Sequence, residues 1–360
     1  MKPTQKLHEL GQSLWLDNIT RAMLGDGTLE GYIRDLSVTG LTSNPSIFDK
    51  AISGTSDYDE QIAEDGPDAD STEELFFKLA IADLSDATKL FAEVHERTDH
   101  VDGWCSLEVS PTIADDTEAT TKQAAKLHGD AARDNLYIKI PGTPAGLGSI
   151  EESIYAGIPI NVTLLFDADQ YLAAADAYMK GLERRIDEGK NPAVASVASI
   201  FMSRWDVTVA EDAPAQLKNK LGIAVGGRAY KAYRELLESD RWLRLANEGA
   251  RPQRLLWAST GTKDPEASDT LYIEGFASPF TVNTMPENTL KAFADHGEVG
   301  DLFPPDGGNS EQVLGEFEEN GFDVAALARR LQDEGKEAFV KSWEELMSSI
   351  EEKRGEVAAA

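Results

Sequence analysis

The amino-acid sequence predicts a (β/α)8 (TIM) barrel of parallel strands with extra helices at the C-terminus. Three observations predict this fold. Short apolar or alternating runs recur along the 360 residues, most intervening segments have helical periodicity, and polar side chains repeat in one phase of the runs. The same alternation fits an open sheet covered by helices on both faces, but such a sheet does not need a polar phase.

Eight runs are expected to form the strands. They are Leu14–Leu16, Val38–Leu41, Cys105–Val109, Leu136–Ile140, Ile158–Leu165, Val194–Phe201, Leu255–Ala258 and Leu271–Phe276. Helices are expected at Glu73–Glu96, Thr117–His128, Asp167–Glu188, Leu217–Asn247 and Asn288–Phe293, with a final pair at Ser310–Asn320 and Val324–Lys353. No linker divides the chain, so we expect one catalytic domain over residues 1–360 with a loose tail at Gly355–Ala360.

The phase of each run decides which side chains enter the barrel, because successive strand residues point to opposite faces. In the fourth run, Leu136, Ile138 and Ile140 share the face expected under the helices, so Tyr137 and Lys139 point inward. The same rule turns Trp15, Asp17, Ser106, Glu108, Ser110, Asn161, Thr163, Ser199, Phe201, Trp257 and Ser259 inward. It turns Leu14, Leu16, Leu107, Val109, Ile160, Val162, Leu164, Ala198, Ile200, Leu256 and Ala258 outward.

Lys139 is the central candidate, because ionisable groups are almost never buried without a partner or a function. An ammonium group in a closed interior pays a desolvation cost, which favours the neutral amine, a nucleophile that can form a Schiff base with a carbonyl. A structural ion pair with Glu108 or Asp17 is the competing interpretation, but such a pair alone stabilises little. Glu108 and Asp17 would supply the proton transfers of this chemistry. Groups able to orient hydroxyls or a water are Asn44, Asn161 and Thr163.

Two cations follow the later strands. Arg204 lies just beyond the sixth run, and Lys263 lies beyond the seventh, after Ser259. Phosphate sites in barrels of this kind often follow the last strands, and both side chains suit phosphate. Two exposed surface cations fit the sequence equally well.

Composition excludes several classes of protein. With 34 Lys and Arg against 64 Asp and Glu, the formal net charge is −30, which argues against a nucleic-acid partner. The single cysteine, Cys105, excludes an intrachain disulfide framework. Neither a GxGxxG nor a GxxxxGK[ST] motif is present, so no dinucleotide fingerprint or P-loop is found, and the five histidines lie outside the expected strands, so no histidine-based metal site is expected. No signal-peptide layout or membrane span is found, so we expect a cytoplasmic protein without a membrane partner.

Seven motifs resemble the transaldolase family, in its longer bacterial branch. They are SLWLDNI (13–19), GLTSNPSIF (40–48), SLEVSP (106–111), YIKIPGT (137–143), INVTLLF (160–166), SIFMSRWD (199–206) and LLWAST (255–260). The resemblance runs from about Leu10 to the final helices. It implies a (β/α)8 barrel and a pentose phosphate pathway enzyme that moves a dihydroxyacetone unit between sugar phosphates without cofactor or metal.

The resemblance also implies roles for single residues. Lys139 resembles the Schiff-base lysine, and Asp17 the acid/base that deprotonates a hydroxyl to drive carbon–carbon cleavage. Glu108 and Thr163 resemble the pair that holds the catalytic water of imine formation. The implied substrate and phosphate ligands are Asn44, Asn161, Ser199, Arg204 and Ser259. Many members carry an arginine two residues after the seventh-strand serine, where this chain has Gly261, and Lys263 is the nearest cation that could replace it.

Fructose-6-phosphate aldolase, a shorter relative, suggests the main alternative. It carries glutamine at the position of Glu108 and tyrosine at that of Phe201, so both residues here match the transferase. An aldolase that releases free dihydroxyacetone therefore remains the second hypothesis, and a non-catalytic barrel the third. The chain is expected to be a monomer or a homodimer.

Overall fold

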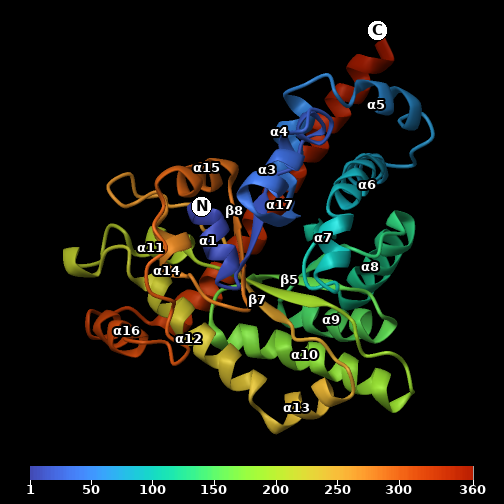
Figure 1. Cartoon of the computed structure of the whole chain (residues 1–360). Helices are drawn as coiled ribbons and strands as arrows, with labels where there is room; N and C mark the ends of the chain where they lie inside the picture. The colour runs from blue at the N-terminus through green and yellow to red at the C-terminus, as the bar shows by residue number, and fades with distance from the viewer. Residues whose placement is uncertain (360) are drawn as a thin grey trace.

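The computed structural model describes residues 1–359 and forms a barrel of eight parallel strands (Figure 1). The strands are β1 (Ser13–Asp17), β2 (Val38–Thr42), β3 (Cys105–Glu108), β4 (Leu136–Pro141), β5 (Ile160–Leu165), β6 (Ser196–Phe201), β7 (Arg254–Ala258) and β8 (Val282–Met285). Their order is β2-β1-β8-β7-β6-β5-β4-β3, and β2 meets β3 through a parallel bridge between Gly40 and Trp104. The expected (β/α)8 barrel is confirmed.

Helices surround the barrel. They are α1 (Pro3–Glu9), α2 (Arg21–Gly25), α3 (Thr28–Leu36), α4 (Pro45–Ser53), α5 (Asp59–Asp65), α6 (Thr72–Leu90), α7 (Ala92–Arg97), α8 (Thr117–Ala131), α9 (Pro144–Ala156), α10 (Ala168–Asp187), α11 (Ser203–Val209), α12 (Leu221–Leu237), α13 (Asp240–Asn247), α14 (Leu271–Gly275), α15 (Glu287–His296), α16 (Ser310–Glu319) and α17 (Val324–Ala359). Among residues 1–359, no helix combines the length and the apolar character needed to cross a membrane.

The prediction of the eighth strand is wrong. Leu271–Phe276 was expected to be that strand, but its first five residues form the short helix α14, which buries the consecutive residues Tyr272 and Ile273. The eighth strand is Val282–Met285. This strand has one polar residue in each phase, Asn283 and Thr284, so it lacks the period-2 pattern by which strands are recognised.

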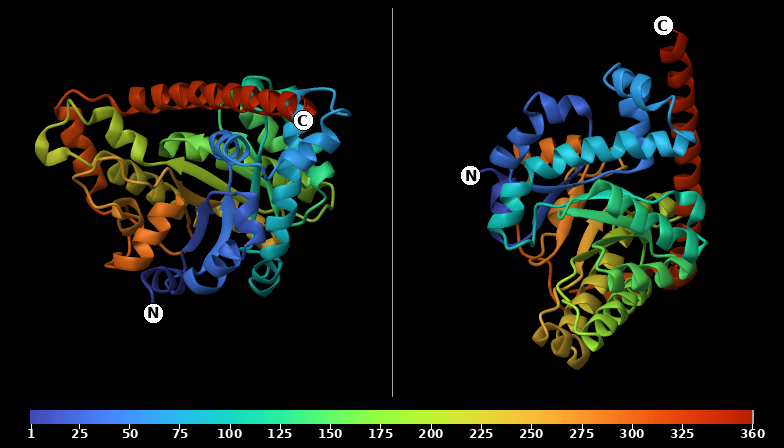
Figure 2. Two further views of the ribbon diagram at one scale, coloured as in Figure 1. Left: turned by 90° about the horizontal axis from the view of Figure 1, so that it is seen from above. Right: turned by 90° about the vertical axis from the view of Figure 1, so that its right-hand side faces the viewer.

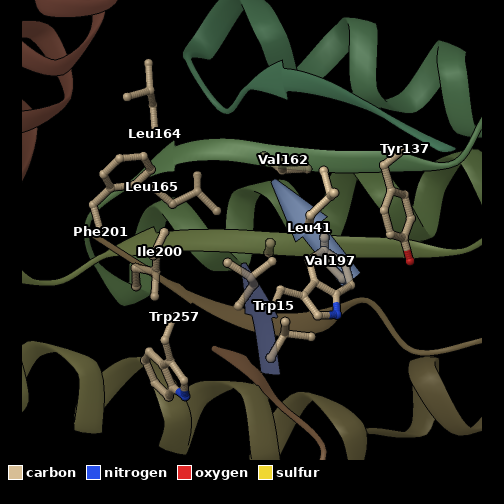
Figure 3. Packing of buried hydrophobic residues seen from close by; sticks show 14 of the residues in the cluster. Trp15, Leu41, Tyr137, Val162, Leu164, Leu165, Val197, Ile200, Phe201 and Trp257 are labelled. Atoms are coloured by element: carbon tan, nitrogen blue, oxygen red, sulfur yellow. The ribbon is translucent and has the colours of Figure 1, made fainter. Parts of the chain in front are cut away.

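The inward phase predicted for the seventh strand is also wrong. Trp257 points away from Trp15 and the barrel interior (Figure 3). Its ring stacks on Phe276 at 4.3 Å between centroids and lies 6.3 Å from Tyr230 of α12. Leu256 and Ala258 therefore take the inner phase, and Ala258 lines the central cavity. The buried Arg254 at the start of the strand sets this phase, because its guanidinium needs polar partners inside the barrel.

Leu164 departs from the predicted outward phase. The β5–β6 register shifts between Val162 and Leu165, and Leu164 has a positive φ of 60°. As a result Leu165 lies beside Val162, next to Gly142, whereas Leu164 packs against α17 near Gly335. The strand thus ends by turning a leucine toward the helix that crosses the mouth of the barrel.

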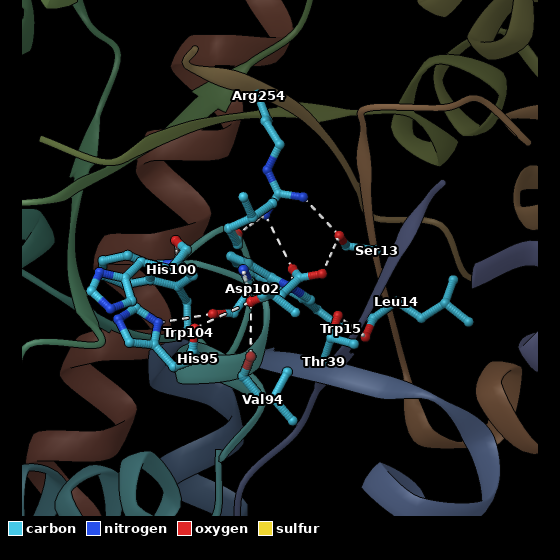
Figure 4. Close-up of polar contacts among 12 residues, drawn as sticks. Ser13, Leu14, Trp15, Thr39, Val94, His95, His100, Asp102, Trp104 and Arg254 are labelled. Atoms are coloured by element: carbon cyan, nitrogen blue, oxygen red, sulfur yellow. Dashed lines mark hydrogen bonds and ion pairs between the residues drawn. The ribbon is translucent and has the colours of Figure 1, made fainter. Parts of the chain in front are cut away.

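A buried ion pair fills the N-terminal end of the barrel (Figure 4). Arg254 Nη2 lies 3.1 Å from Asp102 Oδ1, and its Nη1 donates to Ser13 Oγ at 2.7 Å. Ser13 and Trp15 also donate to the Asp102 carboxylate. The buried charges of Arg254 and Asp102 therefore have polar partners, and these side chains fill this end of the barrel.

The long helix α17 lies along one side of the molecule, and its end packs beside α4 and α5 (Figure 2). Gln332 Nε2 donates to Leu164 O at 2.9 Å and to Gly142 O at 3.1 Å, which holds α17 against the ends of β4 and β5. The helix continues to Ala359, past Gly355 where a loose tail is expected, and Ala360 lies outside the described residues.

Candidate active site

A cavity of about 200 Å³ opens where the strands end, on the side crossed by α17. Nine of the residues singled out from the sequence line it: Asp17, Asn44, Lys139, Thr163, Ser199, Phe201, Arg204, Ser259 and Lys263. The remaining two, Glu108 and Asn161, are buried and hydrogen-bond to residues of its wall. The structure therefore brings the whole predicted set together at one end of the barrel, as the barrel fold requires.

Lys139 reaches the cavity from the middle of β4. Its Nζ lies 3.0 Å from Glu108 Oε2 and donates to Ser43 O at 3.3 Å, and the residue is 5% exposed. The strand register sets these contacts, because Lys139 is paired with Glu108 on β3 and with Asn161 on β5. The ring of Phe339 from α17 lies 5.5 Å from Nζ and covers the amine from the outside.

Two carboxyl groups flank the lysine, the buried Glu108 and the half-buried Asp17. Burial raises the pKa of Asp17, while the charge of Lys139, the Thr42 hydrogen bond and the charge of Lys263 lower it. Burial also raises the pKa of Glu108, against the charge of Lys139 and together with that of Asp17. Carboxyl groups with raised pKa values exchange protons more readily near neutral pH, which suits acid–base chemistry.

Asn161 is held by hydrogen bonds from two sides. Its Nδ2 donates to Ser106 Oγ at 3.1 Å, and its Oδ1 accepts from Ser199 Oγ at 2.7 Å. Two further oxygens, Thr163 Oγ1 on the same strand and Glu108 Oε1 on β3, are buried and have no hydrogen-bond partner within residues 1–359. Buried polar atoms are normally paired, so these two oxygens mark a place for a polar ligand or a water.

Two cations line the cavity. Arg204 is half-buried, with its guanidinium 5.5 Å from the centre of the Phe201 ring, and Lys263 is exposed. Neither forms an ion pair with another residue of the described chain, 1–359. Their place on the cavity favours the anion-binding interpretation over that of two unrelated surface cations. Gly261 also lines the cavity, and Ser259 hydrogen-bonds to Ser203 at 2.9 Å.

Sequence reasoning missed several residues of the cavity wall. From the strands these are Thr42 and Thr284, and from α17 they are Ala338, Phe339 and Ser342. Thr42 directly follows a recognised strand run, and the phase rule applied to that run would have found it. Thr284 lies on the missed strand β8, and the α17 residues reach the site only through tertiary packing.

The comparison with protein families decides the assignment. The family model described as Transaldolase/Fructose-6-phosphate aldolase matches residues 14–350. The chain belongs to this family.

Individual members of the transaldolase/fructose-6-phosphate aldolase family match over nearly their whole length. The chain is 42% identical to a protein named Transaldolase from Parafrankia sp. (strain EAN1pec), over 99% of this chain and 100% of the relative. It is 43% identical to Transaldolase from Kocuria rhizophila, over 97% of each. Identity to Transaldolase 2 of Nostoc punctiforme is 38%, over 97% of this chain and 96% of the relative.

Proposed function

We propose that this chain is a transaldolase. It transfers a dihydroxyacetone unit from sedoheptulose 7-phosphate to glyceraldehyde 3-phosphate, giving erythrose 4-phosphate and fructose 6-phosphate, through a Schiff base on Lys139. The buried contact between the Lys139 amine and Glu108, beside the cavity that Asp17 also lines, is the observation that carries the proposal. The names of the relatives support the reaction type.

The first step forms the imine. The neutral Lys139 amine attacks the ketone carbon of the donor, and the carbinolamine loses its oxygen as water to leave a carbon–nitrogen double bond. Glu108, whose pKa is raised by burial, exchanges the protons that this loss requires. The unpartnered Glu108 Oε1 and Thr163 Oγ1 lie on β3 and β5, the two strands that flank the strand of Lys139, and they support a water beside the lysine.

The second step breaks a carbon–carbon bond. Asp17 accepts the proton of the hydroxyl on the second carbon from the imine carbon. The bond between that hydroxyl-bearing carbon and the carbon next to the imine carbon breaks, and the aldehyde leaves. The bonding electrons move into the protonated imine and form an enamine on Lys139. Addition of the acceptor aldehyde reverses the sequence, with Asp17 returning the proton, and water then releases the product from the lysine.

The proposed substrates carry one phosphate each. Arg204, Lys263 and Ser259 line the cavity and supply a guanidinium, an ammonium and a hydroxyl. In this proposal Lys263 takes the phosphate-binding role of the arginine that many relatives carry where this chain has Gly261. In this proposal Asn44 and Asn161, the latter hydrogen-bonded to Ser199, bind the dihydroxyacetone hydroxyls.

A coupled assay tests the proposal. Purified protein is given sedoheptulose 7-phosphate and glyceraldehyde 3-phosphate, and erythrose 4-phosphate formation is followed; Lys139→Ala and Lys139→Arg are expected to abolish it. Full activity in either variant would contradict the Schiff-base mechanism on Lys139. If free dihydroxyacetone accumulates from fructose 6-phosphate without an acceptor, the protein is an aldolase instead. The cytoplasmic location and the monomer or homodimer remain predictions.

A further inference from the structure

Three adjacent strands place oxygen-bearing side chains next to one another on the cavity wall. Asp17 ends β1, Thr42 ends β2 as its register partner, and Thr284 lies on β8, the other neighbour of β1. Thr42 Oγ1 donates to Asp17 Oδ1 at 2.8 Å, and the Oγ1 atoms of Thr42 and Thr284 are 2.7 Å apart. All three line the cavity, and both threonines are nearly buried.

Asp17, Thr42 and Thr284 form a hydrogen-bond chain, and the number of protons available determines which hydroxyl donates to which. A hydroxyl has one proton to donate. With Asp17 ionised, Thr42 gives its proton to the carboxylate, so the contact between the two threonines forms only if Thr284 donates to Thr42. The proton of Thr284 is then committed as well, and Thr284 Oγ1 offers the cavity only its lone pairs.

We infer that Thr42 positions Asp17 for proton transfer and that Thr284 selects a substrate hydroxyl, the two acting through one oriented hydrogen-bond chain. This inference rests on the proposed function. By occupying Asp17 Oδ1, Thr42 leaves Oδ2 free to accept the proton of the reacting hydroxyl. Thr284, as an acceptor, favours a ligand with a hydroxyl at that place and disfavours a carbonyl or a phosphate oxygen, which would leave two acceptors facing each other.

Other charged groups also face Asp17, and the test must separate their effects. Lys139 on β4 and Lys263 after β7 favour its ionised form, whereas Glu108 on β3 disfavours it. Because Asp17 and Glu108 interact, the pKa values seen in a rate profile belong to the pair. A change at Thr42 leaves both lysines and Glu108 in place, so it isolates the contribution of the hydroxyl.

The experiment compares Thr42→Val, Thr42→Ser, Thr284→Val and Thr284→Ser with Thr39→Val as the matched control. Thr39 is equally buried on β2, but its hydroxyl contacts Leu14 O near the opposite end of the barrel. In Thr42→Val we expect kcat to fall on the order of 10-fold and the acidic limb of the kcat/KM profile to move to higher pH, because Asp17 loses a hydrogen bond to its charged form.

Thr284→Val is expected to raise KM for the donor sugar more than it lowers kcat, because the variant lacks the oxygen that accepts a hydrogen bond from the substrate hydroxyl. Both serine variants should restore the wild-type values, and Thr39→Val should keep the wild-type pH profile. A wild-type pH profile in Thr42→Val, or serine variants that behave like valine, would overturn the inference. Thr42→Ala removes the same hydroxyl and replaces Thr42→Val in this comparison if the valine variant does not fold.

A readout without substrate separates this inference from the proposed function. The Asp17 carboxyl carbon is titrated by NMR in ¹³C-aspartate-labelled protein, with Asp17→Asn used to assign the signal. An upward shift of the Asp17 pKa in Thr42→Val supports the proposed hydrogen-bond chain even if fructose 6-phosphate leaves no adduct on the wild-type protein. An unchanged Asp17 pKa overturns the proposed hydrogen-bond chain even if the adduct forms.

Discussion

At the scale of single residues, the site depends on a buried lysine with two carboxyl groups nearby, Glu108 on the neighbouring strand β3 and Asp17 on β1. A buried ion pair by itself adds little to stability, since desolvation offsets the attraction between the charges. Here the contact between Lys139 and Glu108 lies beside a cavity with unpartnered oxygen atoms, so the pair faces a place where a ligand fits. Reactivity is therefore the simpler explanation for these charges.

Glu108→Gln tests the role of the second carboxyl group. The amide fills the same space beside Lys139 but does not exchange protons, so imine formation should slow by roughly 10²-fold or more. The rate of borohydride-trapped adduct formation measures this step, with the exposed Glu235→Gln as the control. Equal trapping rates in Glu108→Gln and wild type would count against proton transfer by Glu108.

His95 lies at the N-terminal end of the barrel, and we expect it to make the free energy of unfolding depend on pH. Burial lowers its pKa below the ordinary value of 6.5, although a contact with Asp102 O opposes this. Below pH 6.5 the unfolded chain then binds more protons than the folded one, so the free energy of unfolding should fall as the pH drops toward 5. His95→Gln should flatten this slope, as measured by denaturant unfolding at several pH values.

His296 provides the contrasting variant. Hydrogen bonds to Asp269 and Asp295 raise its pKa, so any stability it contributes is present at low pH and lost as the pH rises through the folded pKa. Because His296 is exposed, His296→Gln should leave the slope nearly unchanged or make it slightly steeper. If His296→Gln flattened the slope as much as His95→Gln, the assignment to His95 would be wrong.

At the scale of elements, the alternation of strands and helices was enough to predict the barrel, and the inward phase was enough to predict most of the strand residues that line its cavity. Lys139, Glu108, Asn161 and Ser199 alternate regularly, and they lie where the phase rule puts them. The rule failed at Trp257, because the buried Arg254 fixes the phase of β7. Ser259 nonetheless reaches the cavity, because its positive φ of 54° interrupts the alternation after the strand.

The contribution of α17 could not be predicted, since a helix of the right length has no sequence signal for where it docks. Phe339 and Ser342 reach the cavity only because α17 crosses the mouth of the barrel. Gln332→Leu, which removes two hydrogen bonds to Leu164 O and Gly142 O, should destabilise this docking by about 1–3 kcal/mol. Amide hydrogen exchange should rise in α17 and kcat should fall.

The control for this prediction is Gln312→Leu, at an exposed position on α16 whose side chain contacts Glu316. This variant should leave exchange in α17 unchanged. Equal protection of α17 in Gln332→Leu and wild type would show that other contacts hold the helix over the site.

At the scale of the whole molecule, the net charge of −30 surrounds a cavity lined by Lys139, Arg204 and Lys263. Self-repulsion of the acidic surface destabilises the compact state, and salt screens it, with a Debye length of about 3 Å at 1 M. We therefore expect the melting temperature to rise by a few degrees between low salt and about 1 M NaCl. Because screening does not depend on the identity of the cation, tetramethylammonium chloride should raise the melting temperature by the same amount. A melting temperature that falls in both salts would contradict this account.

The most direct test of the central claim is borohydride reduction in the presence of fructose 6-phosphate, followed by peptide mass spectrometry. We predict a reduced dihydroxyacetone adduct on the peptide that contains Lys139, and no adduct in Lys139→Ala. An adduct on another lysine, or none on protein shown to be folded, would contradict the Schiff-base mechanism.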